Sequence, residues 1–325
     1  MTIVRLYSIR KLCSALVLGV LSALPCVGQA EDVALKAGAV RSGSYTEPTV
    51  EKLIDQGRLP EARARLRELL SGNGEAPRLL LFEAMILYRE NRHSDSLRVL
   101  ERVLRLNYAD PDVYKLIGLN LVAGGRDDLA GSYFEKAVEL APRDFMARYY
   151  LSLHQLTNKQ FNLAVTSAQI AINLNPRYLD GYLVLGVAQE QLGKEGDAIE
   201  TYRQACQTAE QNEFKNEMPF LYLARLLISM QQFEQCLPPL KQALAINPNL
   251  AEAHALIGQT LLRFEKYEQA IGALREAVRL APNEKTPHYV LMGIYQKLGR
   301  AEEARREMLI FRELEEKEKQ KEKQK

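Results

Sequence analysis

The chain has 325 residues, a length that alone would favour two domains. Its 43 Lys and Arg residues nearly balance its 41 Asp and Glu residues, and the formal net charge is +2. This balance excludes the basic excess with which nucleic-acid-binding proteins neutralise phosphates.

The N-terminus has the pattern of a secretory signal. Three basic residues precede an apolar run over residues 12–24, and the small residues Gly28 and Ala30 follow it. A basic start, an apolar centre and small residues before the cleavage point are typical of a signal peptide. We therefore expect cleavage after Ala30, which would leave 40 basic against 41 acidic residues.

Two other fates of this signal stay open. If it is not cleaved, it would anchor the chain in the inner membrane and leave the rest facing the periplasm, although a bilayer span needs about 20 apolar residues. Lipidation of Cys26 is disfavoured, because Pro25 stands where a lipoprotein signal has a small residue.

Residues 31–48 contain glycine, serine and proline with little apolar periodicity, which predicts a flexible leader. Helical periodicity begins after this segment. A degenerate first unit, residues 49–76, has Leu53, Gly57 and Ala62 in helical spacing. We interpret it as a partial copy of the units that follow.

The rest of the chain repeats itself every 34 residues. The pattern is clearest in Ala251 to Pro282, where the spacing is G-x2-L-x8-A-x6-A-x4-P. These positions are Gly258, Leu261, Ala270, Ala277 and Pro282. One period earlier they are Ala224, Leu227, Cys236, Ala243 and Pro248. Recurrence at such a period indicates a repeat architecture.

Each unit reads as a helix, a tight turn and a second helix, because apolar residues recur at three- and four-residue intervals on both sides of a break. In residues 111–144 the break is Gly124 and Gly125. Gly118 and Ala130 are small, which predicts that the two helices approach closely there. Pro142 stands where the second helix must stop, since proline donates no amide hydrogen.

These motifs resemble the tetratricopeptide repeat family over roughly residues 46 to 311. The resemblance implies an all-α fold, a right-handed superhelical solenoid of helix-turn-helix repeats. Stacked repeats stabilise one another, so we expect one elongated domain and not two. The expected divisions are a signal at 1–30, a leader at 31–48, an array at 49–311 and a charged tail at 312–325. Within the array they are 49–76, 77–110, 111–144, 145–178, 179–216, 217–250, 251–284 and 285–311.

Two segments depart from the regular period. The unit 179–216 has 38 residues, and its four extra residues predict an extended second helix or a bulging loop within 207–216. The tail 312–325 alternates glutamate with lysine and has no apolar residue after Leu314. It predicts a solvated helix extension or a frayed end.

Catalytic and metal-binding motifs are not found in the sequence. The four histidines, His93, His154, His254 and His288, form no H-E-x-x-H motif, and there is no phosphate-binding loop or nucleophile elbow. We expect no enzyme activity, cofactor, metal or small-molecule substrate. Cys206 and Cys236 remain after cleavage; buried free thiols are favoured, and a disulfide stays open.

The resemblance implies that a partner protein binds in a concave groove lined by the first helix of each repeat. In this family the groove positions are the second, fifth, ninth, twelfth and thirteenth residues of that helix. Carried onto this chain, they give Leu81, Met85, Tyr88, Lys115, Leu119, Met146, Tyr149, Leu153, Leu156, Leu183, Val187, Leu221, Arg225 and Ile228. Further such positions are Val122, Glu190, Met218, Ala255, Gln259, Leu262, Tyr289 and Gln296. The family's clamp for a terminal carboxylate needs lysine at the fifth place and asparagine at the ninth, and here Lys115 is paired with Leu119. We expect an exposed apolar run, which costs about 25 cal/mol per Å² unless a partner covers it.

The expected function is a non-catalytic scaffold or adaptor that binds an apolar or amphipathic segment of a partner protein. With an export signal and no second domain, the chain is similar to bacterial periplasmic repeat proteins of pilus, polysaccharide-export or cell-wall assemblies. A periplasmic chaperone or holdase for unfolded clients is the alternative, since it would use the same groove. We expect no nucleic-acid partner, and membrane contact only through an uncleaved signal; the oligomeric state stays open.

Overall fold

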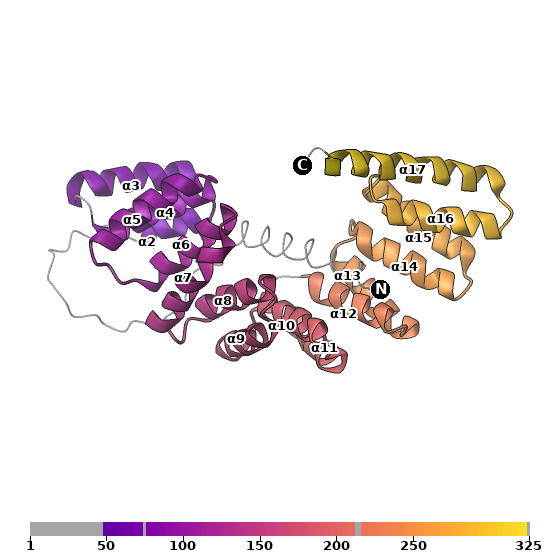
Figure 1. The fold of residues 1–325 in the computed structure, drawn as a ribbon, viewed down its shortest axis with the longest axis horizontal. Helices are drawn as coiled ribbons and strands as arrows, with labels where there is room; N and C mark the ends of the chain where they lie inside the picture. Colours follow the sequence, from indigo (N-terminus) through magenta and orange to yellow (C-terminus); the bar gives the residue numbers. More distant parts are fainter. Residues whose placement is uncertain (1–47, 74–75, 212–215, 324–325) are drawn as a thin grey trace. The chain divides into compact units, whose positions relative to one another are not determined.

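The structure is a computed structural model that describes residues 48–73, 76–211 and 216–323. Over these residues it contains sixteen α-helices and no strand (Figure 1). The all-α fold class that the sequence predicts is confirmed. The expected signal and nearly all of the expected leader lie within residues 1–47, outside the described range.

The chain divides into two compact units, Met1–Asn175 and Pro176–Lys325. The helices of unit 1 are α2 (Pro48–Asp55), α3 (Leu59–Asn73), α4 (Pro77–Arg89), α5 (His93–Arg105), α6 (Pro111–Ala123), α7 (Asp127–Leu140), α8 (Phe145–Thr157) and α9 (Phe161–Leu174). Those of unit 2 are α10 (Leu179–Gln191), α11 (Glu195–Gln211), α12 (Met218–Ser229), α13 (Phe233–Ile246), α14 (Ala251–Arg263), α15 (Tyr267–Leu280), α16 (Lys285–Lys297) and α17 (Ala301–Lys323). The continuity of the array across this division stays a prediction.

Each unit is a stack of helical hairpins. The two helices of a repeat pack on each other, and the second helix also contacts the first helix of the next repeat, as α7 contacts α8 and α13 contacts α14. Within each unit, each first helix also contacts the first helix of the next repeat. In unit 1, α4 contacts α6 and α6 contacts α8; in unit 2, α12 contacts α14 and α14 contacts α16. The first helices therefore form a common inner face in each unit.

Small residues let the paired helices approach closely, as the sequence predicts. A side-chain carbon on Gly118 of α6 would lie 2.5 Å from the Phe134 ring of α7. The same relation joins Gly258 of α14 to Leu274 of α15, again at 2.5 Å. Ala130 is completely buried. The small positions of the repeat are thus fixed by the volume of a large side chain on the opposite helix.

The turn within each hairpin depends on one left-handed residue. It is the fifteenth residue of every full repeat, with φ between +57° and +73°. Glycine occupies this position in three repeats, Gly125, Gly193 and Gly299, and other residues in four, Asn91, Lys159, Gln231 and Glu265. Glycine adopts this conformation without steric cost, whereas the side chains of the other residues crowd their own backbone.

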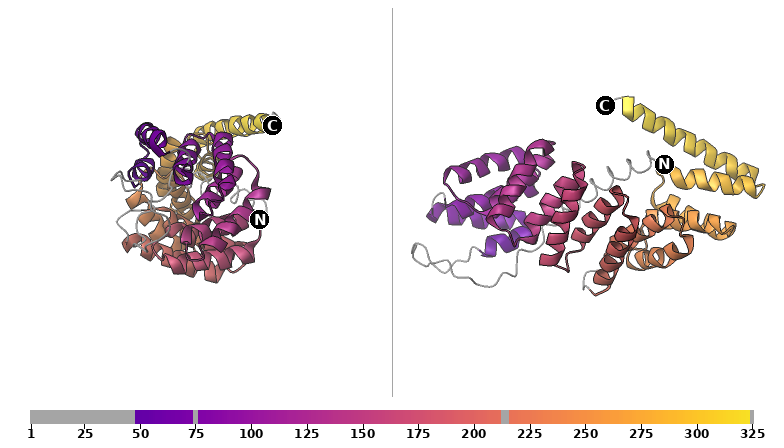
Figure 2. Two further views of the ribbon diagram at one scale, coloured as in Figure 1. Left: turned by 90° about the vertical axis from the view of Figure 1, so that its left-hand side faces the viewer. Right: turned by 60° about the horizontal axis from the view of Figure 1, so that its bottom comes forward.

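The longer repeat and the tail both end in extended helices. Helix α11 has 17 residues and continues to Gln211, where the other interior second helices of unit 2, α13 and α15, have 14. Helix α17 has 23 residues and lies beside α16 (Figures 1 and 2). An ion pair between Lys285 and Glu318 ties its extension to the start of α16. The sequence left a helix or a loop open for 207–216, and a helix extension or a frayed end for 312–325. Residues 207–211 and 312–323 are helical.

Both cysteines of unit 2 are buried free thiols. The Cys236 sulfur lies 3.3 Å from the Thr260 hydroxyl of the next repeat, so it fills the junction between α13 and α14. Burial, helped by the nearby Glu210 carboxylate, raises the pKa of the Cys206 thiol to about 12. Both thiols act as small apolar groups in the core.

Candidate partner-binding surface

The fourteen residues predicted to line a groove lie on first helices of both units. Nine are on α4, α6 and α8 of unit 1, and five are on α10 and α12 of unit 2. Eleven of the fourteen are buried; Met85, Arg225 and Ile228 are half-buried. The expectation that this apolar run stands exposed is therefore wrong for most of its members, and their role in binding stays a prediction.

Lys115 is held inside an ion-pair network. Its ammonium lies 2.6 Å from an Asp112 oxygen and 2.5 Å from an Asp144 oxygen. Burial disfavours the charge on Lys115, but the two carboxylates outweigh it and raise the pKa of Lys115 above its ordinary value. Asp144 also accepts hydrogen bonds from the Met146 and Ala147 amides at the start of α8. Lys115 thus joins α6 to α8, and its charge is already neutralised by the protein.

Beside this network, the inner face of unit 1 carries buried polar atoms that have no hydrogen-bond partner among the described residues. They include Nε and Nη2 of Arg89 on α4 and the hydroxyl of Tyr150 on α8. Burial raises the pKa of Tyr150 above its ordinary range, and the nearby Arg89 charge opposes this rise. Buried donors are normally satisfied, so within the described residues these atoms are available to an acceptor that the chain does not supply.

Sequence reasoning missed both Arg89 and Tyr150. Arg89 is the thirteenth residue of its repeat, a groove position of the family, and that position alone could have indicated it. Tyr150 follows the predicted Tyr149, and their rings lie 5.5 Å apart. Tyr150 also contacts the Phe134 ring at 5.9 Å. This contact with α7 accounts for its burial, and no sequence spacing marks it.

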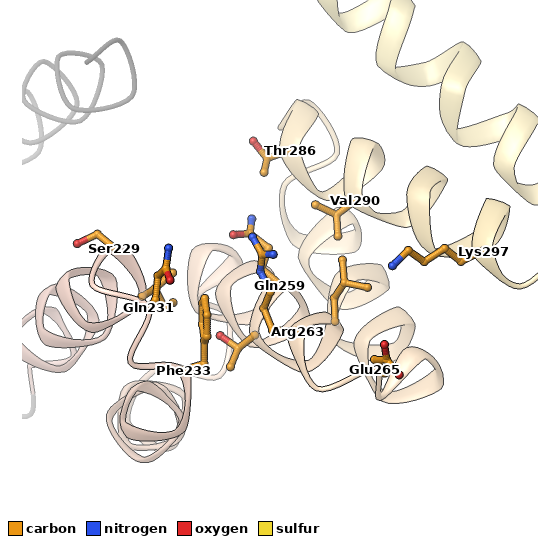
Figure 3. Close-up of a pocket in the computed structure, with 12 residues that line it drawn as sticks. Ser229, Gln231, Phe233, Gln259, Arg263, Glu265, Thr286, Val290 and Lys297 are labelled. Atoms are coloured by element: carbon orange, nitrogen blue, oxygen red, sulfur yellow. The ribbon is translucent and has the colours of Figure 1, made fainter. Parts of the chain in front are cut away.

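Unit 2 contains a pocket of about 740 Å³ on the same inner face (Figure 3). Its walls come from α12, the start of α13, α14 and α16. The lining residues are Ile228, Ser229, Gln231, Phe233, Gln259, Thr260, Leu262, Arg263, Glu265, Thr286, Val290 and Lys297. Ile228, Gln259 and Leu262 among them are predicted groove positions. The pocket therefore lies along the first helices of the last three repeats, with mixed polar and apolar walls.

The pocket has two cationic side chains, Arg263 and Lys297, each the thirteenth residue of its repeat. Figure 3 shows them reaching toward the pocket from α14 and α16. The Arg263 guanidinium lies over the Phe233 ring at 5.6 Å, and the Lys297 ammonium over the Tyr267 ring at 5.9 Å. Within the described part of the chain, no carboxylate lies within 4 Å of either group.

The described residues offer no arrangement for two other kinds of site, a metal site and a membrane span. No group of three or more His, Cys, Asp or Glu side chains there is arranged to hold a metal ion. No described helix combines the length and apolar character of a membrane span. The surface formed by first helices is thus the candidate site that the fold offers.

Comparison with known families agrees with the repeat period. Models described as "Tetratricopeptide repeat" match residues 53–119, 111–144 and 149–213. The chain belongs to the tetratricopeptide repeat family. A model of anaphase-promoting complex subunit 3 matches residues 198–277, so nearly the whole repeat region resembles known repeats of this kind.

Curated relatives resemble part of the chain. The Cell division cycle protein 27 homolog of Caenorhabditis elegans is 33% identical over 87 residues, which are 27% of this chain and 11% of that protein. Anaphase-promoting complex subunit 3 of Schizosaccharomyces pombe is 25% identical over 192 residues, 59% of this chain and 28% of that protein. The chain thus spans less than a third of either relative.

Solved structures share the tetratricopeptide repeat fold at low identity. The Cut9 and Hcn1 hetero-tetramer has a TM-score of 0.60 and 17% identity, with 75% of this chain and 48% of that chain covered. PilW, a widely conserved type IV pilus biogenesis factor, has a TM-score of 0.53 and 16% identity, with 61% and 90% covered. At such identities the likeness supports the fold and leaves the partner open.

Proposed function

We propose that this chain is an exported, non-catalytic tetratricopeptide repeat scaffold of a bacterial envelope assembly, and that it binds a segment of a partner protein on its inner face. The fold is generally one that binds proteins, and the sequence supports export through its signal pattern. A type IV pilus is one such envelope assembly. PilW, which has a similar fold, is a type IV pilus biogenesis factor.

The observation that carries the binding proposal is the pair of unsatisfied groups in unit 1. A buried N–H group of a charged side chain that lacks an acceptor costs more than an ordinary lost hydrogen bond, and Arg89 has two nitrogens of this kind, Nε and Nη2. Arg89 and the Tyr150 hydroxyl both donate, so the missing ligand group accepts hydrogen bonds. Met85, which is half-buried on the same helix as Arg89, offers an apolar contact to the apolar side of an amphipathic segment.

The test is photo-crosslinking in the source bacterium. A benzophenone side chain at Met85, which is half-buried on α4, should capture one or two defined envelope proteins. The double change Arg89→Gln and Tyr150→Phe should reduce this capture at least tenfold, because it removes a charged donor worth about 1.5–3 kcal/mol and a hydroxyl donor worth about 0.5–1.5 kcal/mol. Arg98→Gln on α5, whose side chain is 75% exposed, is the matched control and should leave capture unchanged.

Three outcomes of this test decide between the proposals. Capture of many unrelated unfolded proteins would favour the holdase. Equal capture by the double variant would remove the Arg89 region from the binding surface. N-terminal sequencing of the same material should begin at Glu31, and an intact leader would contradict cleavage.

A further inference from the structure

The pocket of unit 2 brings together two cations that have no acidic partner among the residues that the structure describes. Apart from Arg89, whose Nε and Nη2 also lack a hydrogen-bond partner there, the groove cations of the other repeats are paired with acids of the protein. Arg78 lies 3.6 Å from Glu51 and 3.4 Å from Asp110, Lys115 is held by two carboxylates, and Arg225 lies 3.6 Å from Glu252. Arg263 and Lys297 have no such neighbour within the described residues. Glu265 is the single acid among the lining residues.

The ring beneath Arg263 prepares it for a carboxylate. A guanidinium stacked over an aromatic ring keeps its in-plane N–H groups free, because the contact uses only its flat face. Phe233 provides that ring at 5.6 Å. Two parallel N–H groups match the two oxygens of a carboxylate, which gives a strong and directional pair.

The remaining walls fit an extended segment better than a helix. Gln231, Gln259 and Thr286 offer amide and hydroxyl groups, whereas Phe233, Leu262 and Val290 are apolar. A helix satisfies its own backbone groups, but an extended chain needs donors and acceptors from its binding site. A volume of about 740 Å³ is within the range of pockets that hold a drug-sized ligand, and a stretch of a few residues is of comparable size.

We propose that this pocket binds an extended segment of the partner protein through an internal Asp or Glu side chain, which lies between Arg263 and Lys297. The inference rests on the proposed binding function and adds a second contact to it, separate from the Arg89 region of unit 1. The geometry is unlike the family's clamp for a terminal carboxylate, because both cations are thirteenth residues and Gln259 stands at the ninth place of its repeat.

The test is peptide selection with the full chain. The probe is a library of random twelve-residue peptides joined to the carrier at both ends, so that none has a free carboxyl terminus. The unchanged chain should select peptides enriched in Asp or Glu at one position. Arg263→Gln with Lys297→Gln should abolish the enrichment, and Arg263→Glu with Lys297→Glu should shift it to Lys and Arg. Arg279→Gln on α15, whose side chain is 62% exposed, is the matched control and should select acidic peptides.

A selected peptide then gives the size of the effect. Changing its Asp or Glu to the amide should weaken binding about tenfold or more to the unchanged chain, as expected for a charge-assisted pair. The same change should have less than about a twofold effect on the Arg263→Gln, Lys297→Gln variant. Circular dichroism checks that both double variants keep their helices, and the charge-reversed variant must still select peptides.

The outcomes separate this inference from the proposed function. Selection of peptides without acidic preference overturns the inference alone. Binding that appears only with a second library, displayed with free carboxyl termini, also overturns it and assigns the pocket to a terminal carboxylate. Selection of no peptide by any variant, together with loss of the Met85 crosslink, overturns both proposals.

Discussion

At the scale of single residues, pairs of small and large side chains set the distance between helices. Gly118 and Phe134 form one such pair, and Gly258 and Leu274 form another. These pairs were predictable, because the small residues recur at the repeat period. Lys115 shows the opposite case. Its partner Asp144 is 29 residues away and caps the first helix of the next repeat, so the sequence placed Lys115 in the groove without indicating this ion pair.

Replacing Gly118 with alanine should destabilise the protein by about 1–3 kcal/mol, because the new methyl group would overlap the Phe134 ring. Urea unfolding followed by circular dichroism measures the loss. Adding Phe134→Leu should recover part of it, which shows as a coupling energy in a double-mutant cycle. Gly272→Ala on α15 is the control, since nothing lies within 4 Å of the added carbon, and it should stabilise the helix slightly.

At the scale of helices, turn chemistry explains both the regularity of the hairpins and its limits. The breaks at Gly125, Gly193 and Gly299 are marked by glycine in the sequence. The equivalent turns at Lys159 and Gln231 have the same left-handed backbone without glycine. Repeat phase predicts those turns, whereas local composition does not. The extension of α11 to Gln211 could be narrowed only to a helix or a loop, because its polar residues suit either.

Replacing Lys159 with glycine should stabilise the protein by about 0.5–1 kcal/mol. The lysine side chain is exposed and its backbone φ is +60°, so the change relieves crowding and removes no buried contact. The midpoint of urea unfolding should rise with an unchanged slope. The reverse change, Gly125→Ala at φ +73°, should lower that midpoint, and a fall in both variants would contradict the steric explanation.

At the scale of the whole molecule, the repeat period predicts the family and the succession of helices, but it does not predict which inner residues are buried. Tyr149 and Leu183 occupy groove positions by spacing, yet both are almost completely buried. Burial depends on how neighbouring repeats pack, which is a property of the stack and not of one unit. The unpaired cations Arg263 and Lys297 could not be recognised either, because pairing depends on acids elsewhere in the unit.

Because both thiols of unit 2 are buried, their rate of chemical labelling measures local unfolding of this unit. Only the thiolate reacts with disulfide reagents, and a pKa raised from 9.0 to about 12 lowers the thiolate fraction of native Cys206 about a thousandfold near neutral pH. With Cys13→Ser and Cys26→Ser in place, labelling should therefore follow the transient exposure of α11 and α13 alone. Rapid labelling under native conditions would contradict this burial. A peptide bound in the pocket of unit 2 should slow the labelling further, because it stabilises the folded state. One colorimetric assay would then follow both peptide binding and local unfolding.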